Sequence, residues 1–285
     1  MVTSTTGTVG IVGSGIMAGG IAEVVARGGM HAILRARTEA AATGALQQVA
    51  KGLARQVEKG KLDASERDRI LANMSTVTDL SGLAECDIVI ESVVEDLTTK
   101  QQLFRELDAV AKPGALLATN TSTLPVIEMA KVVGRPERVC GIHFFNPAPL
   151  LPLVEVVRPV TASDETMDQA LAFVASIGKD GVRVLDRAGF IVNALLFPYL
   201  NNAIRMLEDG TASMEDIDTA MKGGCNFPMG PFALLDLVGL DTSLAILETL
   251  HASFGDDNFA PRPMLRSLVD EGRLGRKTKA GFYVY

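Results

Sequence analysis

The chain has 285 residues, enough to bury a large hydrophobic core, and this length favours two packed domains over one. Its formal net charge of −7 argues against nucleic acid or an anionic membrane as a partner, because both attract positively charged surfaces. No apolar run is as long as a membrane-spanning helix, no secretory pattern opens the chain, and three widely spaced cysteines do not suggest disulfides, so we expect a cytoplasmic protein without a membrane span.

Short β-rich runs alternate with helical patterns through the first two thirds of the chain. Strands are predicted over residues 8–12, 31–34, 87–91, 115–119, 139–145 and 153–157, and helices over 15–28, 38–58 and 98–110. This alternation is typical of a Rossmann-type α/β fold with a doubly wound, mostly parallel sheet. From residue 186 onward the periodicity is helical only. We therefore predict a dinucleotide-binding domain over 1–185 and an all-α domain over 186–285.

A glycine-rich turn follows the first predicted strand and opens the first predicted helix. Gly13 would permit the tight turn, Gly15 would let the backbone approach a pyrophosphate, and Ala18 would allow the helix to pack closely on the sheet. Ile16 and Met17 begin the helix whose N-terminus would face the phosphates. The alternative is a turn without a ligand, but the strand before it and the helix after it favour dinucleotide binding.

The end of the second predicted strand bears on the choice of cofactor. NAD(H) enzymes of this fold have an acidic residue here, which bonds the ribose hydroxyls and would repel a 2′-phosphate. This chain has Ala36 between Arg35 and Arg37, and arginine pairs well with phosphate. We therefore expect NADP(H) in preference to NAD(H). The alternative is that an arginine stacks on the adenine or faces solvent, which would leave NAD(H) possible.

A basic segment follows, in a region predicted to form a helix, a turn near Gly60 and a second helix. Its cations are Lys51, Arg55, Lys59, Lys61, Arg67 and Arg69. Such a run is often only the solvated face of a helical hairpin. In a chain of net negative charge it would also supply the local cations that an anionic substrate requires.

Polar residues gather on the later predicted strands or directly after them. They are Asn120, Ser122, His143, Asn146 and Glu155. Because the carboxyl ends of strands line the ligand crevice of a doubly wound sheet, we expect these groups beside the nicotinamide. Histidine titrates near neutrality and suits the proton transfer that accompanies hydride transfer, with a carboxylate such as Glu155 orienting the ring. A purely structural His143 is the alternative, although the neighbouring polar groups favour catalysis.

Seven blocks of sequence, taken in order, point to one known family. They read GSGIMAGGIAEVVA, IVIESVVEDLTTKQQLF, ATNTSTLP, GIHFFNPAPLLPLVEVV, DRAGFIVNALLFPYLNNAIRMLEDG, EDIDTAMKGGCNFPMGPFALLDLVGLD and GRLGRKTKAGFYVY. In these blocks the chain resembles the 3-hydroxyacyl-CoA dehydrogenases, particularly the bacterial 3-hydroxybutyryl-CoA dehydrogenases, over nearly its whole length. Seven blocks in the right order are far more specific than any single motif.

The resemblance implies a role for each matching residue. The catalytic set would be His143 as the base, Glu155 as its carboxylate partner, and Ser122 and Asn193 as donors to the reacting oxygen. The positions near the ribose and nicotinamide are Glu95, Lys100 and Asn120. Lys51 and Arg55 match positions that hold the coenzyme A phosphates, and Asn146 completes the expected substrate-binding set. The helical domain would form a homodimer.

The implied reaction is reversible hydride transfer between NADP(H) and the 3-hydroxy/3-oxo group of a short acyl-CoA, with reduction of acetoacetyl-CoA as the expected direction. Two alternatives remain: the same chemistry on a group bound to an acyl carrier protein, and a non-catalytic nucleotide-binding protein. The joint presence of Ser122, His143, Glu155 and Asn193 argues against the second. The chain departs from the family pattern at Ala36, which lacks the cofactor-selecting acid, and at Thr123, which keeps a hydroxyl.

Overall fold

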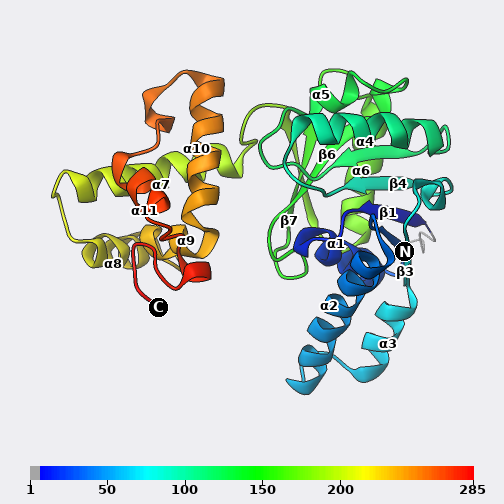
Figure 1. Ribbon diagram of the computed structural model, residues 1–285, viewed down its shortest axis with the longest axis horizontal. Coiled ribbons are helices and arrows are strands. Elements are labelled where there is room, and N and C mark those ends of the chain that lie inside the picture. The colour runs from blue at the N-terminus through cyan, green and yellow to red at the C-terminus, as the bar shows by residue number, and fades with distance from the viewer. Residues whose placement is uncertain (1–6) are drawn as a thin grey trace. The chain divides into compact units, whose positions relative to one another are not determined.

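The computed structural model describes residues 7–285, which form two compact units. The first ends at Asp186 and is built on an eight-stranded sheet, whereas the second, Arg187–Tyr285, is built from helices. Figure 1 shows the sheet of the first unit with helices on both of its faces. The predicted class, a Rossmann-type sheet followed by an all-α unit, is confirmed.

The sheet has the strand order β3-β2-β1-β4-β5-β6-β7-β8. The strands are β1 (Thr8–Val12), β2 (His31–Arg35), β3 (Met74–Val77), β4 (Ile88–Glu91), β5 (Leu116–Thr119), β6 (Val139–Phe144), β7 (Leu153–Arg158) and β8 (Asp180–Leu185). All neighbours are parallel except β6 and β7, which are antiparallel. Strand direction therefore reverses once across the sheet, between β6, which carries His143, and β7, which carries Glu155.

The two edge strands, β3 and β8, were not predicted from the sequence. β3 is a short run with two hydroxyl residues, and β8 reads DGVRVL, with every residue partly or fully exposed. An edge strand buries less surface than a central one, so its sequence need not carry an apolar run. The periodicity was therefore too weak to reveal either strand.

Helices pack on both faces of the sheet. Those of the first unit are α1 (Ile16–Arg27), α2 (Glu39–Glu58), α3 (Ala64–Ala72), α4 (Leu97–Val110), α5 (Val126–Ala130) and α6 (Asp164–Ser176), with 3-10 turns η1 (Leu80–Leu83) and η2 (Pro136–Arg138). Ile11, Leu34 and Ile142 share one core with side chains of α1, α2 and α6. α6 was not predicted, although Ser163 caps its N-terminus by accepting a hydrogen bond from Thr166.

The opposite face of the sheet carries the polar residues of interest. Strand register places Glu91 beside Thr119, Thr119 beside Gly141, and His143 beside Glu155, so all of these residues face the same side. A Cβ on Gly141 would lie 3.1 Å from Val126 at the start of α5, which identifies this as the face that α5 covers. The buried polar groups thus share one face at the carboxyl end of the parallel strands.

The second unit consists of helices and a C-terminal segment that is bound to them by hydrogen bonds. Its elements are α7 (Val192–Glu208), α8 (Met214–Cys225), α9 (Pro231–Val238), α10 (Leu240–Phe254), η3 (Asp257–Phe259), α11 (Pro263–Asp270) and η4 (Arg276–Thr278). Phe197, Phe232 and Leu247 lie in its core. No helix among residues 7–285 combines the length and apolar character needed to cross a bilayer.

Two buried aspartates hold the end of this unit. Asp236 accepts hydrogen bonds from the backbone N–H groups of Phe282 and Tyr283, both at 2.8 Å. Asp218 accepts from the backbone N–H of Phe232 at 2.8 Å and from the Tyr283 hydroxyl at 3.0 Å. Each carboxylate is therefore paired with several donors, which offsets the cost of burying it.

Candidate active site

The glycine-rich turn has the geometry that a pyrophosphate requires. Gly13 has φ +144°, and a Cβ there would lie 2.3 Å from the carbonyl oxygen of Ser92, so only glycine fits. Gly15 is the N-cap of α1, makes no side-chain capping bond, and has no atom within 4 Å of a built Cβ. The first turn of α1 also lacks an acidic side chain. An anionic phosphate therefore fits against these N–H groups.

Ile16 and Met17 form the first turn of α1, as the motif predicted. The Ile16 side chain is 74% exposed, whereas Met17 packs partly against the core of the sheet. The exposed Ile16 side chain at the start of α1 is an apolar surface against which a flat ring of a ligand could pack.

The two arginines after β2 have different surroundings. Arg35 is half-buried, and its Nε donates to the Thr78 carbonyl at 3.1 Å. Arg37 is exposed and forms no hydrogen bond or ion pair with any residue in the range 7–285. Ala36 between them is buried. Of the two guanidinium groups, Arg37 is therefore the one available to a ligand at low cost.

An acidic residue lies close to Arg35. The pKa of Asp79 is below its ordinary value because the Ser81 hydroxyl and the Ser81 backbone N–H bond to its carboxylate, with a smaller attraction from Arg35. Asp79 thus balances part of the positive charge at Arg35, which leaves Arg37 as the less compensated cation.

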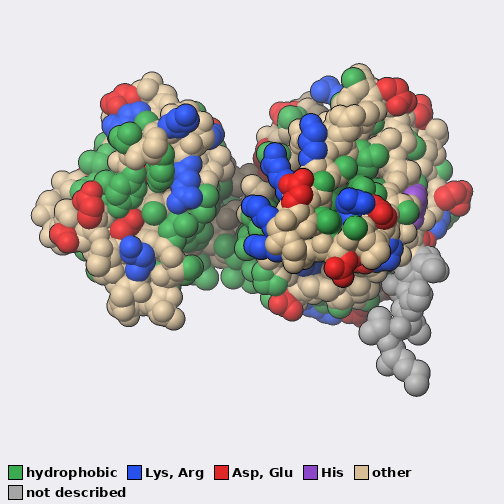
Figure 2. All heavy atoms as spheres, turned by 90° about the horizontal axis from the view of Figure 1, so that it is seen from below, with side chains coloured by type: hydrophobic (Ala, Val, Ile, Leu, Met, Phe, Trp, Pro, Cys, Tyr) green, Lys and Arg blue, Asp and Glu red, His purple; other side chains and the backbone are tan. Residues whose placement is uncertain are grey.

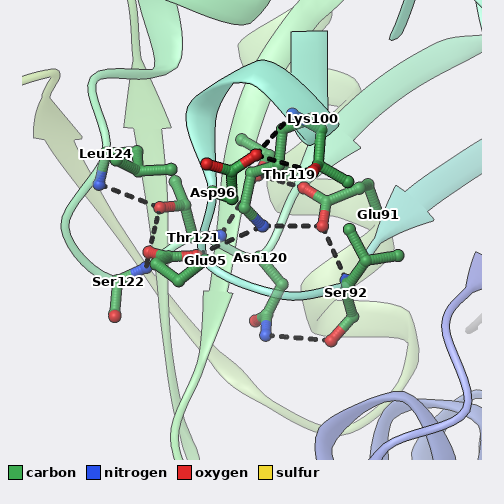
Figure 3. A network of polar contacts seen from close by, with 12 residues as sticks. Glu91, Ser92, Glu95, Asp96, Lys100, Thr119, Asn120, Thr121, Ser122 and Leu124 are labelled. Carbon is green, nitrogen blue, oxygen red and sulfur yellow. Dashed lines mark hydrogen bonds and ion pairs between the residues drawn. The ribbon is translucent and has the colours of Figure 1, made fainter. Parts of the chain in front are cut away.

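Lys100 lies inside the protein rather than on a ligand-facing surface. Its side chain is 1% exposed, and its Nζ lies 2.6 Å from Glu91 Oε1 and 3.2 Å from Glu95 Oε2. Glu91 is fully buried and also accepts from Val93 N at 2.7 Å and Thr119 Oγ1 at 2.7 Å. Figure 3 shows Lys100 between the two carboxylates. This placement makes Lys100 a support for Glu95.

Glu95 organises the turn that carries Ser122. Its Oε1 accepts hydrogen bonds from Thr121 Oγ1 at 2.5 Å, Ser122 N at 2.9 Å and Thr123 N at 3.2 Å (Figure 3). Burial alone would raise the pKa of Glu95, but the charge of Lys100 and the bonds from Thr121 and Ser122 outweigh it, so the pKa lies below its ordinary value. Glu95 is therefore a fixed carboxylate.

Asn120 ties three strands together where they end. Its backbone N–H donates to the Glu91 carbonyl, and its Oδ1 accepts from Phe144 N, both at 2.8 Å. Its Nδ2 donates to Ser92 Oγ at 3.4 Å. The Ser122 turn and the strand that carries His143 thereby share one hydrogen-bonded frame.

His143 and Glu155 form a buried pair on neighbouring antiparallel strands. The register sets them side by side, with Nδ1 and Oε2 2.7 Å apart. His143 is 5% exposed, Glu155 is fully buried, and the Phe145 ring lies 4.5 Å from the imidazole, centroid to centroid. A carboxylate on Nδ1 holds the ring orientation, and such an imidazole exchanges its proton through Nε2.

The remaining predicted residues lie on other elements. Asn146 is exposed in the connection between β6 and β7. Asn193 is 8% exposed in the first turn of α7 and belongs to the second unit. Lys51 and Arg55 are exposed one helical turn apart on α2. The structure thus joins Glu95, Lys100, Asn120 and Ser122, with the His143–Glu155 pair attached through Asn120 and Phe144.

The basic segment divides into paired and unpaired cations. Arg67 pairs with Asp68 at 2.7 Å, and Arg69 pairs with Glu66 at 2.6 Å. Within residues 7–285 no ion pair involves the other four, which are Lys51, Arg55, Lys59 and Lys61. Figure 2 views the first unit from the side to which α2 and α3 project and shows Lys and Arg side chains on that surface. The uncompensated charge is therefore on α2 and the turn after it.

Glu91, which accepts hydrogen bonds from three parts of the frame, was not predicted as a site residue from the sequence. Glu91 ends the apolar strand IVIE, and a lysine follows nine residues later, at Lys100. An acidic residue at the end of a fully buried strand requires a buried partner. That requirement was the available clue.

Comparison with known proteins identifies the family. The family model described as 3-hydroxyacyl-CoA dehydrogenase, NAD binding domain, matches residues 8–187, and the model described as 3-hydroxyacyl-CoA dehydrogenase, C-terminal domain, matches residues 189–285. The chain belongs to the 3-hydroxyacyl-CoA dehydrogenase family. It is therefore an oxidoreductase, and the match to the family's NAD-binding domain indicates a nicotinamide dinucleotide cofactor.

Members of this dehydrogenase family resemble the chain over nearly their whole length. A 3-hydroxybutyryl-CoA dehydrogenase of Mycobacterium tuberculosis is 45% identical, covering 97% of this chain and 98% of the relative. The crystal structure of (S)-3-hydroxybutyryl-CoA dehydrogenase from Ralstonia eutropha superposes with a TM-score of 0.95 at 39% identity and covers 99% of each chain. The crystal structure of M. tuberculosis FadB2 also gives a TM-score of 0.95, at 45% identity, and covers 97% of this chain and 98% of that one. The resemblance read from the seven sequence blocks is confirmed.

Proposed function

We propose that the protein catalyses reversible hydride transfer between NADP(H) and the 3-hydroxy/3-oxo group of a short acyl-CoA, with reduction of acetoacetyl-CoA as its main direction. The observation that carries this proposal is the buried His143–Glu155 pair at the carboxyl end of the sheet, 2.7 Å between Nδ1 and Oε2. Relatives named 3-hydroxybutyryl-CoA dehydrogenase support the substrate.

In the proposed mechanism His143 moves the proton. During reduction its protonated ring donates to the oxygen that becomes the alcohol, and during oxidation the neutral ring accepts that proton. Glu155 stabilises the imidazolium and keeps Nε2 directed at the substrate. Ser122 and Asn193 donate hydrogen bonds to the developing negative charge on the oxygen. When bound, the dinucleotide supplies or accepts the hydride at the 3-carbon.

The first unit also supplies the proposed cofactor contacts. Gly13, Gly15, Ile16 and Met17 lie at the turn that suits the pyrophosphate. Glu95 and Asn120 lie along the strand ends where the ribose and nicotinamide would rest, and Lys100 acts by holding Glu95. Asn146, exposed beyond β6, contacts the substrate in this proposal.

The decisive experiment measures initial rates of acetoacetyl-CoA reduction with His143→Ala. We expect the turnover number to fall about a hundredfold or more, because proton transfer loses its acid. His251→Ala, which changes a partly exposed histidine of the second unit, is the control and should leave the rate unchanged. A rate near wild type in His143→Ala would overturn the assignment, and no rate in the wild-type protein would favour a non-catalytic nucleotide-binding protein.

The proposed preference for NADP(H) rests mainly on Arg37. An exposed guanidinium that has no partner among residues 7–285 can bind a 2′-phosphate without breaking bonds to them. We expect Arg37→Ala to lower kcat/KM for NADPH about tenfold or more and to change kcat/KM for NADH little. Wild-type kcat/KM that favours NADH would assign these arginines another role and make NAD(H) the cofactor.

Lys51 and Arg55 are proposed to hold the coenzyme A phosphates. Their charges lie one turn apart on α2 and are uncompensated within residues 7–285. The double variant Lys51→Ala/Arg55→Ala should raise KM for acetoacetyl-CoA but not for acetoacetyl-N-acetylcysteamine, which lacks the nucleotide. If the carrier-bound acetoacetyl thioester is instead the better wild-type substrate, the acyl-carrier-protein alternative is favoured, because the same cations suit its acidic surface.

The second unit is proposed to form a homodimer. Its exposed apolar side chains include Leu195 (71% exposed), Leu237 (50%) and Phe254 (43%), and Figure 2 shows hydrophobic side chains gathered on the visible face of this unit. Exposed apolar surface favours association. Sedimentation of the full chain tests the proposal, and a monomer at micromolar concentration would contradict it.

A further inference from the structure

An eight-residue connection joins the two strands that carry the proton-transfer pair. β6 ends at Phe144 and β7 begins at Leu153, so the connection comprises residues 145–152. The Pro147 carbonyl accepts hydrogen bonds from Leu150 N at 3.0 Å and Leu151 N at 3.1 Å, which makes a local turn within it. This connection joins the strand that carries His143 directly to the strand that carries Glu155.

Lys179 binds this connection from another part of the chain. It lies between α6 and β8, and its Nζ donates to the carbonyl oxygens of Ala148 and Leu151, both at 2.7 Å. The next residue, Asp180, donates its backbone N–H to the Pro152 carbonyl at 2.8 Å. One ammonium group thus binds two carbonyl oxygens of the connection, and β8, which pairs with β7, begins at the next residue.

The same connection is pressed against the dinucleotide-type helix. A Cβ on Gly20 of α1 would lie 3.3 Å from Ala148 Cβ and 3.4 Å from Pro149 Cδ. Arg27 and Glu23 of α1 are the charged groups that influence Lys179. Burial lowers the pKa of Lys179 and Arg27 lowers it further, while Glu23 opposes them. The ammonium is therefore held at a site that disfavours its charge, where two carbonyl oxygens compensate it.

We propose that Lys179 is a positioning residue for the proposed reaction: by fixing the connection between β6 and β7, its ammonium holds His143 and Glu155 side by side. The inference rests on the proposed function of that pair. It follows from the antiparallel geometry, because the two side chains face each other across one strand pair and Lys179 binds the connection that joins those two strands. Loosening the connection changes the distance and angle between imidazole and carboxylate.

The test compares Lys179→Met with a matched control, Lys112→Met. Lys112 also bonds a backbone carbonyl, that of Glu85 at 3.0 Å, and it pairs with Asp87 at the amino end of the sheet. Both variants lose an ammonium that joins two chain segments, but only Lys179 lies at the β6–β7 connection. Lys179→Arg keeps the charge and the donors, so it should restore the wild-type behaviour.

Two readouts separate positioning from stability. We expect kcat for acetoacetyl-CoA to fall on the order of tenfold in Lys179→Met, since small displacements of catalytic groups have large effects on rate. The chain has three histidines, so NMR resolves the ring N–H proton of His143 without any cofactor or substrate. The chemical shift of that proton reports the hydrogen bond between Nδ1 and Glu155, and it should move upfield in Lys179→Met because a loosened connection lengthens this bond.

The outcomes are distinct. An upfield shift of the His143 N–H proton in Lys179→Met, absent in Lys112→Met and reversed in Lys179→Arg, supports the proposal even if the wild-type protein fails to reduce acetoacetyl-CoA. A lower melting temperature with wild-type kcat and a wild-type chemical shift overturns it. If Lys179→Met does not fold, Lys179→Gln is measured instead, and a chemical shift equal to that of Lys179→Arg overturns the proposal.

Discussion

At the scale of single residues, charge pairs hold the candidate site in place. Glu95 joins the buried Lys100 to the backbone of the Ser122 turn, although its own side chain is 36% exposed. A carboxylate with this set of donors is stabilised in its charged form, so neutralising it should weaken the turn. The position of the Ser122 turn therefore depends on the Glu95–Lys100 pair.

Glu95→Gln should lower the free energy of unfolding by about 1 kcal/mol at pH 7, a value kept small because the partly exposed side chain is screened. The pKa of Glu95 is depressed in the fold, so its stabilising effect is present above the ordinary value of 4.5 and is lost as pH falls through the lower, folded value. The difference between wild type and variant should therefore shrink below pH 4.5. Urea unfolding at several pH values measures this, with exposed Glu106→Gln as the control.

The polar residues of the sheet could be predicted from the sequence, because they lie within apolar strands or directly follow them. His143 and Glu155 lie within β6 and β7, and Asn120 follows β5. Glu91 and Lys179 could not be found in this way. Their importance comes from contacts between segments distant in the chain, such as Lys179 with Ala148, and no local pattern records those contacts.

At the scale of elements, one carboxylate links the end of the sheet to the segment after Ser122. Asp186 follows β8 and accepts hydrogen bonds from Val126 N at 2.9 Å and Ile127 N at 2.7 Å, the first residues of α5. Burial raises the pKa of Asp186, and the two N–H groups oppose that effect. The start of α5 is thus fixed by a residue 60 positions later in the chain.

Asp186→Ala should leave these two N–H groups without their acceptor and lower the free energy of unfolding by about 1–2 kcal/mol. Hydrogen exchange should become faster in residues 122–130, because that segment loses its anchor. Mass spectrometry of the exchanged peptides measures this effect. Asp168→Ala removes a surface carboxylate that pairs with Arg183, so it is a matched control and should leave the same peptides unchanged.

The elements that were predicted and those that were missed differ in burial. Central strands such as β4, with all four residues buried, are visible as apolar runs. β3 and β8 lie at the edges of the sheet, where polar side chains are tolerated. The periodicity of a sequence reports burial, and it therefore reports edge strands poorly.

At the scale of the whole molecule, the chain folds as two units with separate cores, Met167 and Phe173 in one and Phe197 and Phe232 in the other. The core of the second unit is completed by the last residues of the chain. A Cβ on Gly281 would lie 1.9 Å from Asp236 Oδ1, which leaves no room for a side chain.

Gly281→Ala should therefore destabilise the second unit by about 3 kcal/mol, because the added methyl displaces a buried carboxylate from its donors. Gly223→Ala is the control, since a Cβ there meets no atom within 4 Å and replaces glycine within α8. It should stabilise the unit by about 0.5–1 kcal/mol. Calorimetry of both variants checks the prediction, and equal melting temperatures would contradict it.

The C-terminal segment that Asp218 and Asp236 bind also contains tyrosines, which are the source of the protein's intrinsic fluorescence. The chain has no tryptophan, and its three tyrosines are Tyr199, Tyr283 and Tyr285, all within the second unit. The Tyr283 hydroxyl donates a hydrogen bond to Asp218, and the Tyr285 hydroxyl donates one to Asp236. Tyrosine emission therefore follows the second unit alone, and unfolding confined to the Rossmann sheet is silent in that signal. An experimenter can therefore follow the second unit without attaching a label.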